Sequence, residues 1–423
     1  MTTVSDATFR SLATGGGGAT AAAELYGLQI RRRLSLLRGV MEETRLSNHP
    51  QADLVTAAYE TISELAAEFP EVVAKVIRHP PVTAWAWTVY QSARSHGSFD
   101  PRRMGAIAVA ATVAAGASRH VKVVMDDDGT LMLPSLGLLT PAGTATEIDV
   151  DGTRLSASDW SADLDLSADG PGWRVLHRIE LADGFEVILD DLDPHRWSET
   201  GEVAPRLDEQ AAADWGVQLR GAWKVLKARH PVVSAEVETI ISAIAPIRSQ
   251  GSGVASASSR QSFGTIAMST PGGRPAWLAE TLAHEIQHAK LDALMQLVPL
   301  IRYERTDRYY APWRPDPRPA HGLLQGAYAY LGVVEFWRRE HPFEGRLGRV
   351  EFARWREAVE DVTDTLMKEH VLTEAGTTFV DGMRTRLEEL LADPLDDESV
   401  KAARKAADSH RADWVARNGA SDR

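Results

Sequence analysis

Two histidines and a glutamate within five residues carry the clearest chemical signal in the chain. His284, Glu285 and His288 form an HExxH pattern in a segment whose apolar residues recur at helical spacing. On a helix, His284 and His288 lie one turn apart, so both imidazoles project from the same side and can bind one divalent ion. Glu285 lies on the adjacent face, where it could reach a water bound to that ion. The pattern predicts a metal site on a helix that begins near Pro275.

Two imidazoles do not complete a metal site, so a third ligand must come from another element. Residues 320–337 are apolar on most faces, which predicts a buried helix with a few polar side chains that need partners. His321 at its start is our first candidate and Glu335 the second. Other candidates nearby in sequence are Glu304, Asp307, Asp316 and His341. Glu280 and Asp292, one turn to either side of the histidine pair, are expected to orient the imidazoles rather than bind the ion.

The third ligand decides the chemistry. Two histidines and a glutamate on zinc, with Glu285 as general base, would make a zinc metallopeptidase. A third imidazole could also serve zinc hydrolysis, but three nitrogens and open positions would equally suit Fe(II) and an oxygenase. A peptide-binding module with a structural metal, or none, is a further alternative. Periodicity does not separate these possibilities.

The composition narrows the classes of protein. The 423-residue chain has 46 Lys and Arg against 59 Asp and Glu, a net charge of −13 that disfavours a nucleic-acid partner. It has no cysteine, so any metal must be bound by His, Asp or Glu. The longest apolar run, 104–117, is shorter than the ~20 residues that span a bilayer, and residues 1–20 lack a secretory signal. We expect a cytoplasmic protein without a membrane partner.

The periodicity of apolar residues predicts three regions. Residues 1–118 are expected to be helical, with helices over 21–43, 53–69, 81–95 and 101–117. Residues 119–205 are expected to form a small antiparallel β subdomain, because three Asp-Gly turns, at 128–129, 151–152 and 183–184, separate runs that alternate with period two. Residues 206–423 are expected to be the helical catalytic region. The glycines at 15–18 are interpreted as a flexible joint, because no phosphate-loop signature follows them.

The predicted fold is therefore mainly α with an inserted small antiparallel β subdomain. A strand is expected over 262–269, followed by a Pro/Gly turn and the HExxH helix. A strand beside such a helix is the zincin-like arrangement, in which an extended peptide adds to the strand.

The HExxH helix and its flanks resemble a known family. The runs at 262–269, 278–288, 310–322 and 325–329 are similar to bacterial HExxH-motif peptide-modification proteins. The similarity is densest over 262–339 and also touches residues 15–37. Members of this family accompany ribosomally made peptide natural products and are understood to be 2-oxoglutarate-dependent peptide β-hydroxylases.

The resemblance implies an iron site and a redox reaction. Fe(II) would be bound by His284, His288 and His321, with 2-oxoglutarate and O2 as cosubstrates; Zn is the alternative metal. The substrate would be a precursor peptide, with the Asp β-carbon as the favoured site of hydroxylation. Neither the sequence nor the resemblance indicates the oligomeric state. Glu285 would then orient a neighbour or contact substrate instead of acting as a base.

The distal carboxylate of 2-oxoglutarate needs a planar bidentate donor, which arginine supplies better than lysine. Arg314 and Arg318 are the candidates because they are close in sequence to His321. Tyr328 or Ser269 could add a hydroxyl contact to the cosubstrate.

Overall fold

Two units of chain make up the computed structural model, which describes residues 4–182, 184–198, 202–248, 255–269, 273–302 and 307–419. The first unit comprises Met1–Tyr26, Gln218–Ile240 and Pro271–Arg423. The second comprises Gly27–Val217 and Ile241–Thr270. The expected boundaries at 118 and 205 both lie inside the second unit. Residues before and after 118 share one hydrophobic core, which extends from Leu36 to Val175.

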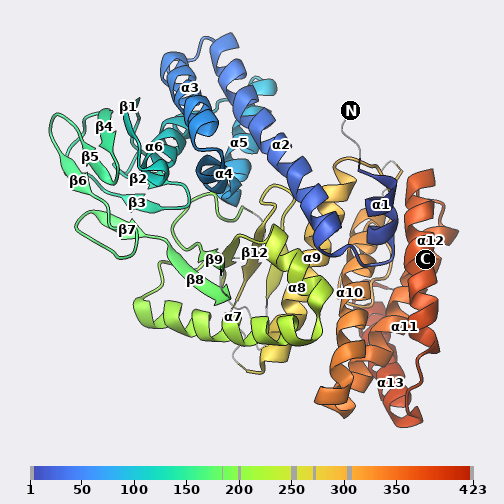
Figure 1. The fold of residues 1–423 in the computed structure, drawn as a ribbon. Coiled ribbons are helices and arrows are strands. Elements are labelled where there is room, and N and C mark those ends of the chain that lie inside the picture. The colour runs from blue at the N-terminus through green and yellow to red at the C-terminus, as the bar shows by residue number, and fades with distance from the viewer. Residues whose placement is uncertain are drawn as a thin grey trace. The chain divides into compact units, whose positions relative to one another are not determined.

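The first unit is a helical assembly (Figure 1). Pro275 occupies the first turn of the HExxH helix, as predicted, and this helix packs against the helix that carries His321. The two run antiparallel, since Trp277 contacts Trp337 at one end and Asp292 contacts Gln325 at the other. The helices of this unit are α1 (Asp6–Ala13), α8 (Pro231–Ile240), α9 (Pro275–Met295), α10 (Ala320–Glu344), α11 (Arg346–Lys368), α12 (Glu374–Ala392) and α13 (Asp397–Asn418). Helix α7 (Glu209–Arg229) contains a boundary between the units.

The second unit begins with helices that the apolar spacing predicted. The four expected helices are confirmed, and the most apolar of them is buried from Arg103 to Val113, which explains its lack of a polar face. It ends at Gly116, whose φ of 60° suits a residue without a Cβ. These helices are α2 (Gly18–Leu46), α3 (Ala52–Glu68), α4 (Pro70–Arg78), α5 (Pro80–Arg94) and α6 (Arg103–Ala115), of which α4 was not predicted.

Two small antiparallel sheets follow, so the mainly helical fold with small antiparallel sheets is confirmed. One has the order β1 (Ser118–Lys122), β4 (Glu147–Asp151), β5 (Arg154–Ser156) and β6 (Ser161–Asp163). The other has the order β2 (Leu131–Leu133), β3 (Gly137–Leu139) and β7 (Trp173–Val175). The hairpin around Asp151 and Gly152 forms as predicted.

The first expected hairpin is wrong in its pairing. The turn itself forms, since the Gly129 N–H donates to the Asp126 carbonyl at 2.8 Å. However, β1 pairs with β4 and β2 pairs with β3, so the two flanking strands diverge into different sheets. The register explains this, because Val121 lies opposite Ile148 and both are buried.

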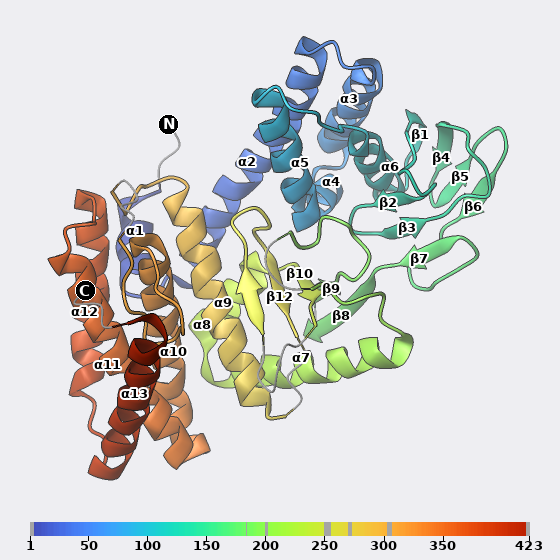
Figure 2. The same cartoon turned by 180° about the vertical axis from the view of Figure 1, so that it is seen from behind.

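The third sheet is mixed, with the order β11 (Ser256–Ser258), β12 (Thr265–Met268), β10 (Ala243–Pro246), β9 (Phe185–Leu189) and β8 (His177–Ala182) (Figure 2). The hairpin of β8 and β9 was predicted, although Asp183 of its turn lies outside the described residues. Strand β10, which pairs in parallel with β9 and β12, was not predicted, because it is fully buried and shows no alternation.

The strand expected over 262–269 is confirmed in its second half, as β12. Both of its edges are occupied, by β11 on one side and β10 on the other. The expectation that a peptide adds to this strand is therefore wrong, since addition requires a free edge. Within the described residues, no helix has the length and apolar character needed to cross a bilayer.

Candidate metal centre

The two histidines of α9 face each other through the nitrogen atoms that bind metals. Their Nε2 atoms are 3.1 Å apart, and their rings meet edge to face with centroids 4.8 Å apart. Two nitrogens each about 2.1 Å from a shared ion subtend about 95° at this separation. Burial, followed by the influence of His288, holds the pKa of His284 well below its usual range, so this imidazole is neutral. Neutral imidazole is the form that binds a metal.

A glutamine from α10 fixes the orientation of His288. Gln325 Nε2 donates to Asp292 Oδ1 at 2.7 Å, and Gln325 Oε1 lies 3.0 Å from His288 Nδ1. Because the amide nitrogen is used by Asp292, the amide oxygen faces the ring, and Nδ1 must carry the hydrogen. The lone pair of His288 is then on Nε2, toward His284. Asp292 thus supports the imidazole as expected, but through Gln325.

Aromatic side chains lie beside His284. The Tyr330 ring meets the His284 ring edge to face, with centroids 5.1 Å apart, and Trp313 stacks on Tyr330 at 4.7 Å. Trp355 of α11 lies against Tyr330 at 4.3 Å. A Cβ at Gly326 would come within 2.3 Å of the Trp313 indole, so this helix position must be glycine. The three aromatic rings limit how the His284 ring can move.

Two carboxyl groups accompany these rings. Burial, with a smaller effect of Glu351, raises the pKa of Glu280 to about 8. Burial also raises the pKa of Glu351, whose Oε2 accepts from Trp355 Nε1 at 2.7 Å. Glu280 precedes His284 by one turn of α9 and is protonated at neutral pH. It therefore carries a donor hydrogen at this pH.

Among the residues that the structure describes, no third His, Asp or Glu has a ligand atom within 4.8 Å of both histidine nitrogens. Within the described residues, the one set of three or more His, Asp or Glu side chains whose ligand atoms all lie within 4.8 Å of one another is in the second unit. His321 is half-buried at the second position of α10, one turn before Gln325. The carboxylate of Glu335, the second candidate, accepts from Arg386 of α12. Glu304 lies outside the described residues.

The two candidate arginines share one carboxylate. Arg314 Nε donates to Asp316 Oδ1 at 3.0 Å, and an amino group of Arg318 donates to Asp316 Oδ2 at 3.2 Å. Their side chains are 52% and 38% exposed, so each guanidinium retains donors that face solvent. Arg314 directly follows Trp313, whose ring stacks on the Tyr330 ring beside His284.

The two hydroxyls proposed as cosubstrate contacts are engaged elsewhere. Tyr328 is fully buried, and its hydroxyl donates to the Leu12 carbonyl at 2.8 Å. Ser269 is buried in the second unit, where its Oγ accepts from the Ala255 N–H at 3.0 Å. Both residues therefore have structural contacts, and we withdraw Tyr328 and Ser269 as cosubstrate contacts.

Another face of α9 binds the glycine-rich segment. Lys290 Nζ donates to the Gly16 carbonyl at 2.9 Å and to Glu236 Oε1 at 2.8 Å, and both charged groups are fully buried. Gln287 Nε2 donates to the Gly15 carbonyl at 3.2 Å. Gly15, Gly17 and Gly18 have φ values of 75°, 130° and 60°, which glycine adopts without strain. The glycine-rich segment is therefore fixed to α9, and its interpretation as a flexible joint is wrong.

Glu285 is only 2% exposed, although it follows His284 directly. A general base for hydrolysis must reach a water on the metal. Burial of this carboxylate favours a positioning role over that of a base.

Taken together, the two imidazoles of α9 and the glutamine of α10 that orients one of them can bind one divalent ion.

Comparison with known proteins adds no assignment. No protein-family model matches the chain, and no curated protein matches it significantly.

Proposed function

We propose that the chain is an Fe(II)- and 2-oxoglutarate-dependent dioxygenase that hydroxylates a side-chain β-carbon, with Asp favoured, in a ribosomally made precursor peptide. The observation that supports this most is the 3.1 Å approach of the His284 and His288 Nε2 atoms. The neutral state of His284 and the Gln325-bound tautomer of His288 suit a divalent ion. The similarity of the flanking runs to the HExxH-motif peptide-modification family supports the choice of iron and 2-oxoglutarate.

His321 is the proposed third ligand. It lies four residues before Gln325, so both side chains share one face of α10. Gln325 already contacts His288, and this face is therefore directed at the metal helix. For His321 to bind the ion, its ring would have to move toward His284 and His288 by about the height of one helical turn, roughly 5 Å along the axis of α10.

Arg314 is the proposed anchor for the distal carboxylate of 2-oxoglutarate. It directly follows Trp313, whose ring stacks on Tyr330, and the Tyr330 ring in turn contacts His284. Binding of the dianion would draw the Arg314 guanidinium away from Asp316, which Arg318 would continue to neutralise. The iron would supply oxygen activation coupled to decarboxylation of the cosubstrate, and the protein residues would position it and exclude water.

The alternative is a zinc metallopeptidase with Glu285 as general base. It uses the same two histidines, so the metal-binding geometry supports it equally. The deep burial of Glu285 weighs against it, because the base must exchange a proton with a metal-bound water.

The test is anaerobic reconstitution of the full chain with Fe(II), followed by 2-oxoglutarate and air, with succinate measured by mass spectrometry. We expect Fe(II)-dependent succinate release, and a higher KM for 2-oxoglutarate in Arg314→Lys than in the matched control Arg318→Lys. Peptide cleavage by the zinc-loaded protein, without succinate release from the iron-loaded protein, would establish the peptidase instead.

A further inference from the structure

A second set of metal-binding side chains lies in the second unit. His79 is the residue between α4 and α5, and Asp190 and Asp193 follow β9. Each offers one ligand atom, and these atoms all lie within 4.8 Å of one another. His79 Nε2 is 3.1 Å from Asp190 Oδ2 and 3.7 Å from Asp193 Oδ2. All three residues are at most 1% exposed.

The loop after β9 directs one oxygen of each aspartate at His79. Asp190 Oδ1 accepts the N–H groups of Leu192 and Asp193, at 3.3 and 2.9 Å. Asp193 Oδ1 accepts the N–H of His195 at 2.9 Å. Because the backbone occupies the two Oδ1 atoms, both Oδ2 atoms are left on the side of the imidazole.

The close atoms of this set do not hydrogen-bond in the observed geometry. His79 Nε2 and Asp190 Oδ2 are buried, and neither has a hydrogen-bond partner among the described residues, despite their 3.1 Å separation. A protonated imidazole would direct its N–H along the line to the carboxylate oxygen. Buried nitrogen and oxygen atoms that lie this close without such alignment can act together as ligands of one metal ion. Buried polar atoms that lack a partner are unfavourable.

The charges of the buried set also leave room for a cation. The Arg103 guanidinium donates to Asp193 Oδ2 and neutralises one of the two carboxylates. One negative charge remains, and either a proton on His79 or a divalent ion must balance it.

We propose that His79, Asp190 and Asp193 bind a divalent transition-metal ion of the Zn²⁺ type, separately from the centre on α9. One imidazole and two carboxylates form a donor set for Zn²⁺ or Mn²⁺. Because the ligands are buried, the ion would fasten the loop after β9 to the junction of α4 and α5 and would not meet substrate. This inference does not depend on the proposed oxygenase function.

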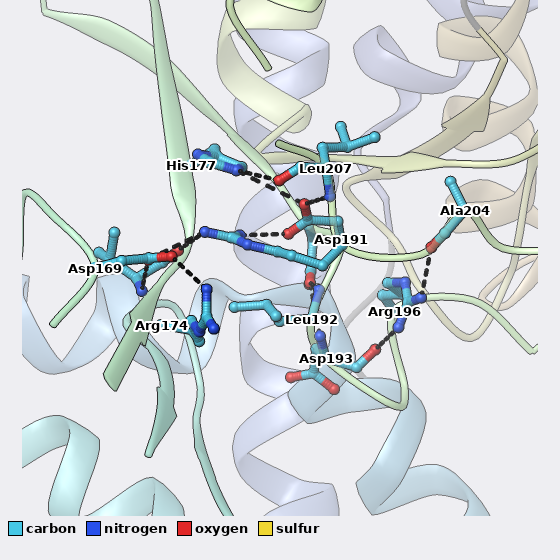
Figure 3. A network of polar contacts seen from close by, with 12 residues as sticks. Asp169, Arg174, His177, Asp191, Leu192, Asp193, Arg196, Ala204 and Leu207 are labelled. Carbon is cyan, nitrogen blue, oxygen red and sulfur yellow. Dashed lines mark hydrogen bonds and ion pairs between the residues drawn. The ribbon is translucent and has the colours of Figure 1, made fainter. Parts of the chain in front are cut away.

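The same loop provides a matched control. Asp191 is as buried as its neighbours, but its Oδ1 accepts from Arg206 at 2.7 Å and its Oδ2 accepts from the Leu207 N–H at 2.8 Å. Figure 3 shows Asp191 directed toward Leu207 and the Asp193 carboxylate directed away from it. Asp191→Asn therefore removes a buried charge from the loop without removing a ligand.

The experiment uses the full-length His284→Ala/His288→Ala variant, which lacks the first centre. We measure Zn²⁺ bound after equilibrium dialysis and the thermal midpoint with and without EDTA. We expect one Zn²⁺ per chain and a midpoint that EDTA lowers. Adding Asp190→Asn or His79→Gln should abolish both effects, whereas adding Asp191→Asn should retain the bound Zn²⁺. X-ray absorption of the Zn²⁺-loaded protein should report one imidazole among oxygen ligands.

Absence of bound Zn²⁺ and of an EDTA effect in the His284→Ala/His288→Ala variant would overturn the proposal and assign the balancing charge to a proton on His79. Loss of Zn²⁺ in Asp191→Asn as well would also overturn it, because binding would then follow loop integrity and not these ligands. If Asp190→Asn and His79→Gln do not fold, the absorption spectrum decides: more than one imidazole around the ion contradicts the proposed set.

Discussion

Gln325 Oε1 lies 3.0 Å from Nδ1 of His288, while the amide nitrogen of the same glutamine donates to Asp292 at 2.7 Å. Helix α10 thereby selects the tautomer of His288, a proposed metal ligand on α9. An imidazole with its hydrogen on Nδ1 presents the Nε2 lone pair toward His284, and free rotation of the ring is suppressed.

Gln325→Met should weaken binding of Fe(II) or Zn²⁺ to the α9 centre by about 10–100-fold, because the residue that orients His288 is lost. Competition with a chelator of known affinity measures this. Gln287→Met is the control, since Gln287 is also a buried glutamine but contacts the Gly15 carbonyl. Equal affinities in the two variants would contradict the role of Gln325.

Glu285→Gln should keep measurable Fe(II)-dependent succinate release. An oxygenase needs no carboxylate base at this position, whereas a hydrolase that loses its base typically slows by about 10²–10⁴-fold. His288→Ala is the comparison and should lose turnover together with the metal. If Glu285→Gln bound iron normally but lost succinate release to that extent, Glu285 would have a catalytic role that our account does not give it.

Lys290→Met should destabilise the protein by about 3–5 kcal/mol, because it leaves the fully buried Glu236 carboxylate without its cation. Urea unfolding measures this, and adding Glu236→Gln should recover part of the loss. Lys227→Met is the control, since its pair with Glu238 is exposed and contributes at most about 1 kcal/mol. Similar losses at both lysines would show that Lys290 does not stabilise the glycine-rich segment.

The contribution of Glu280 to the stability of the metal-free protein should fall as pH rises from about 5 to about 8. Glu280 has a folded-state pKa of about 8 against an ordinary value of 4.5, so the folded state binds its proton more tightly than the unfolded state. Its contribution is complete below the ordinary pKa and is lost as pH rises through the folded pKa. The expected slope is at most about 1.4 kcal/mol per pH unit.

Urea unfolding at several pH values, with EDTA present, tests the role of Glu280. Glu280→Gln should flatten the dependence, and Glu388→Gln, at an exposed position of α12, should leave it unchanged. A slope that persists in Glu280→Gln would assign the effect to another group.

The sequence predicted those features that depend on local spacing. The HExxH pattern placed His284 and His288 on one helix face, and Pro275 marked the start of that helix. Tight turns at Gly152 and Gly184 predicted two hairpins correctly. The turn at Gly129 did not, because a turn fixes local direction but not which distant strand completes the sheet.

Partners from distant elements could not be predicted. Glu335 and Tyr328 were candidates for the metal site, but Arg386 of α12 and the Leu12 carbonyl determine what they bind. The pairing of Gln325 with His288 depends on the antiparallel packing of α9 and α10, which local spacing does not reveal. Lys290 gave no local signal, since its buried partner is 54 positions away in the chain.

The central claim is that two imidazoles from one turn of α9 bind a single divalent ion. Anaerobic Fe(II) titration of the full chain and of His284→Ala and His288→Ala, each alone, tests it most directly. We expect each variant to bind one Fe(II) fewer than the unmodified chain, while His120→Ala, an exposed histidine paired with Asp149 in the second unit, binds normally. Unchanged stoichiometry and affinity in both α9 variants would contradict the account.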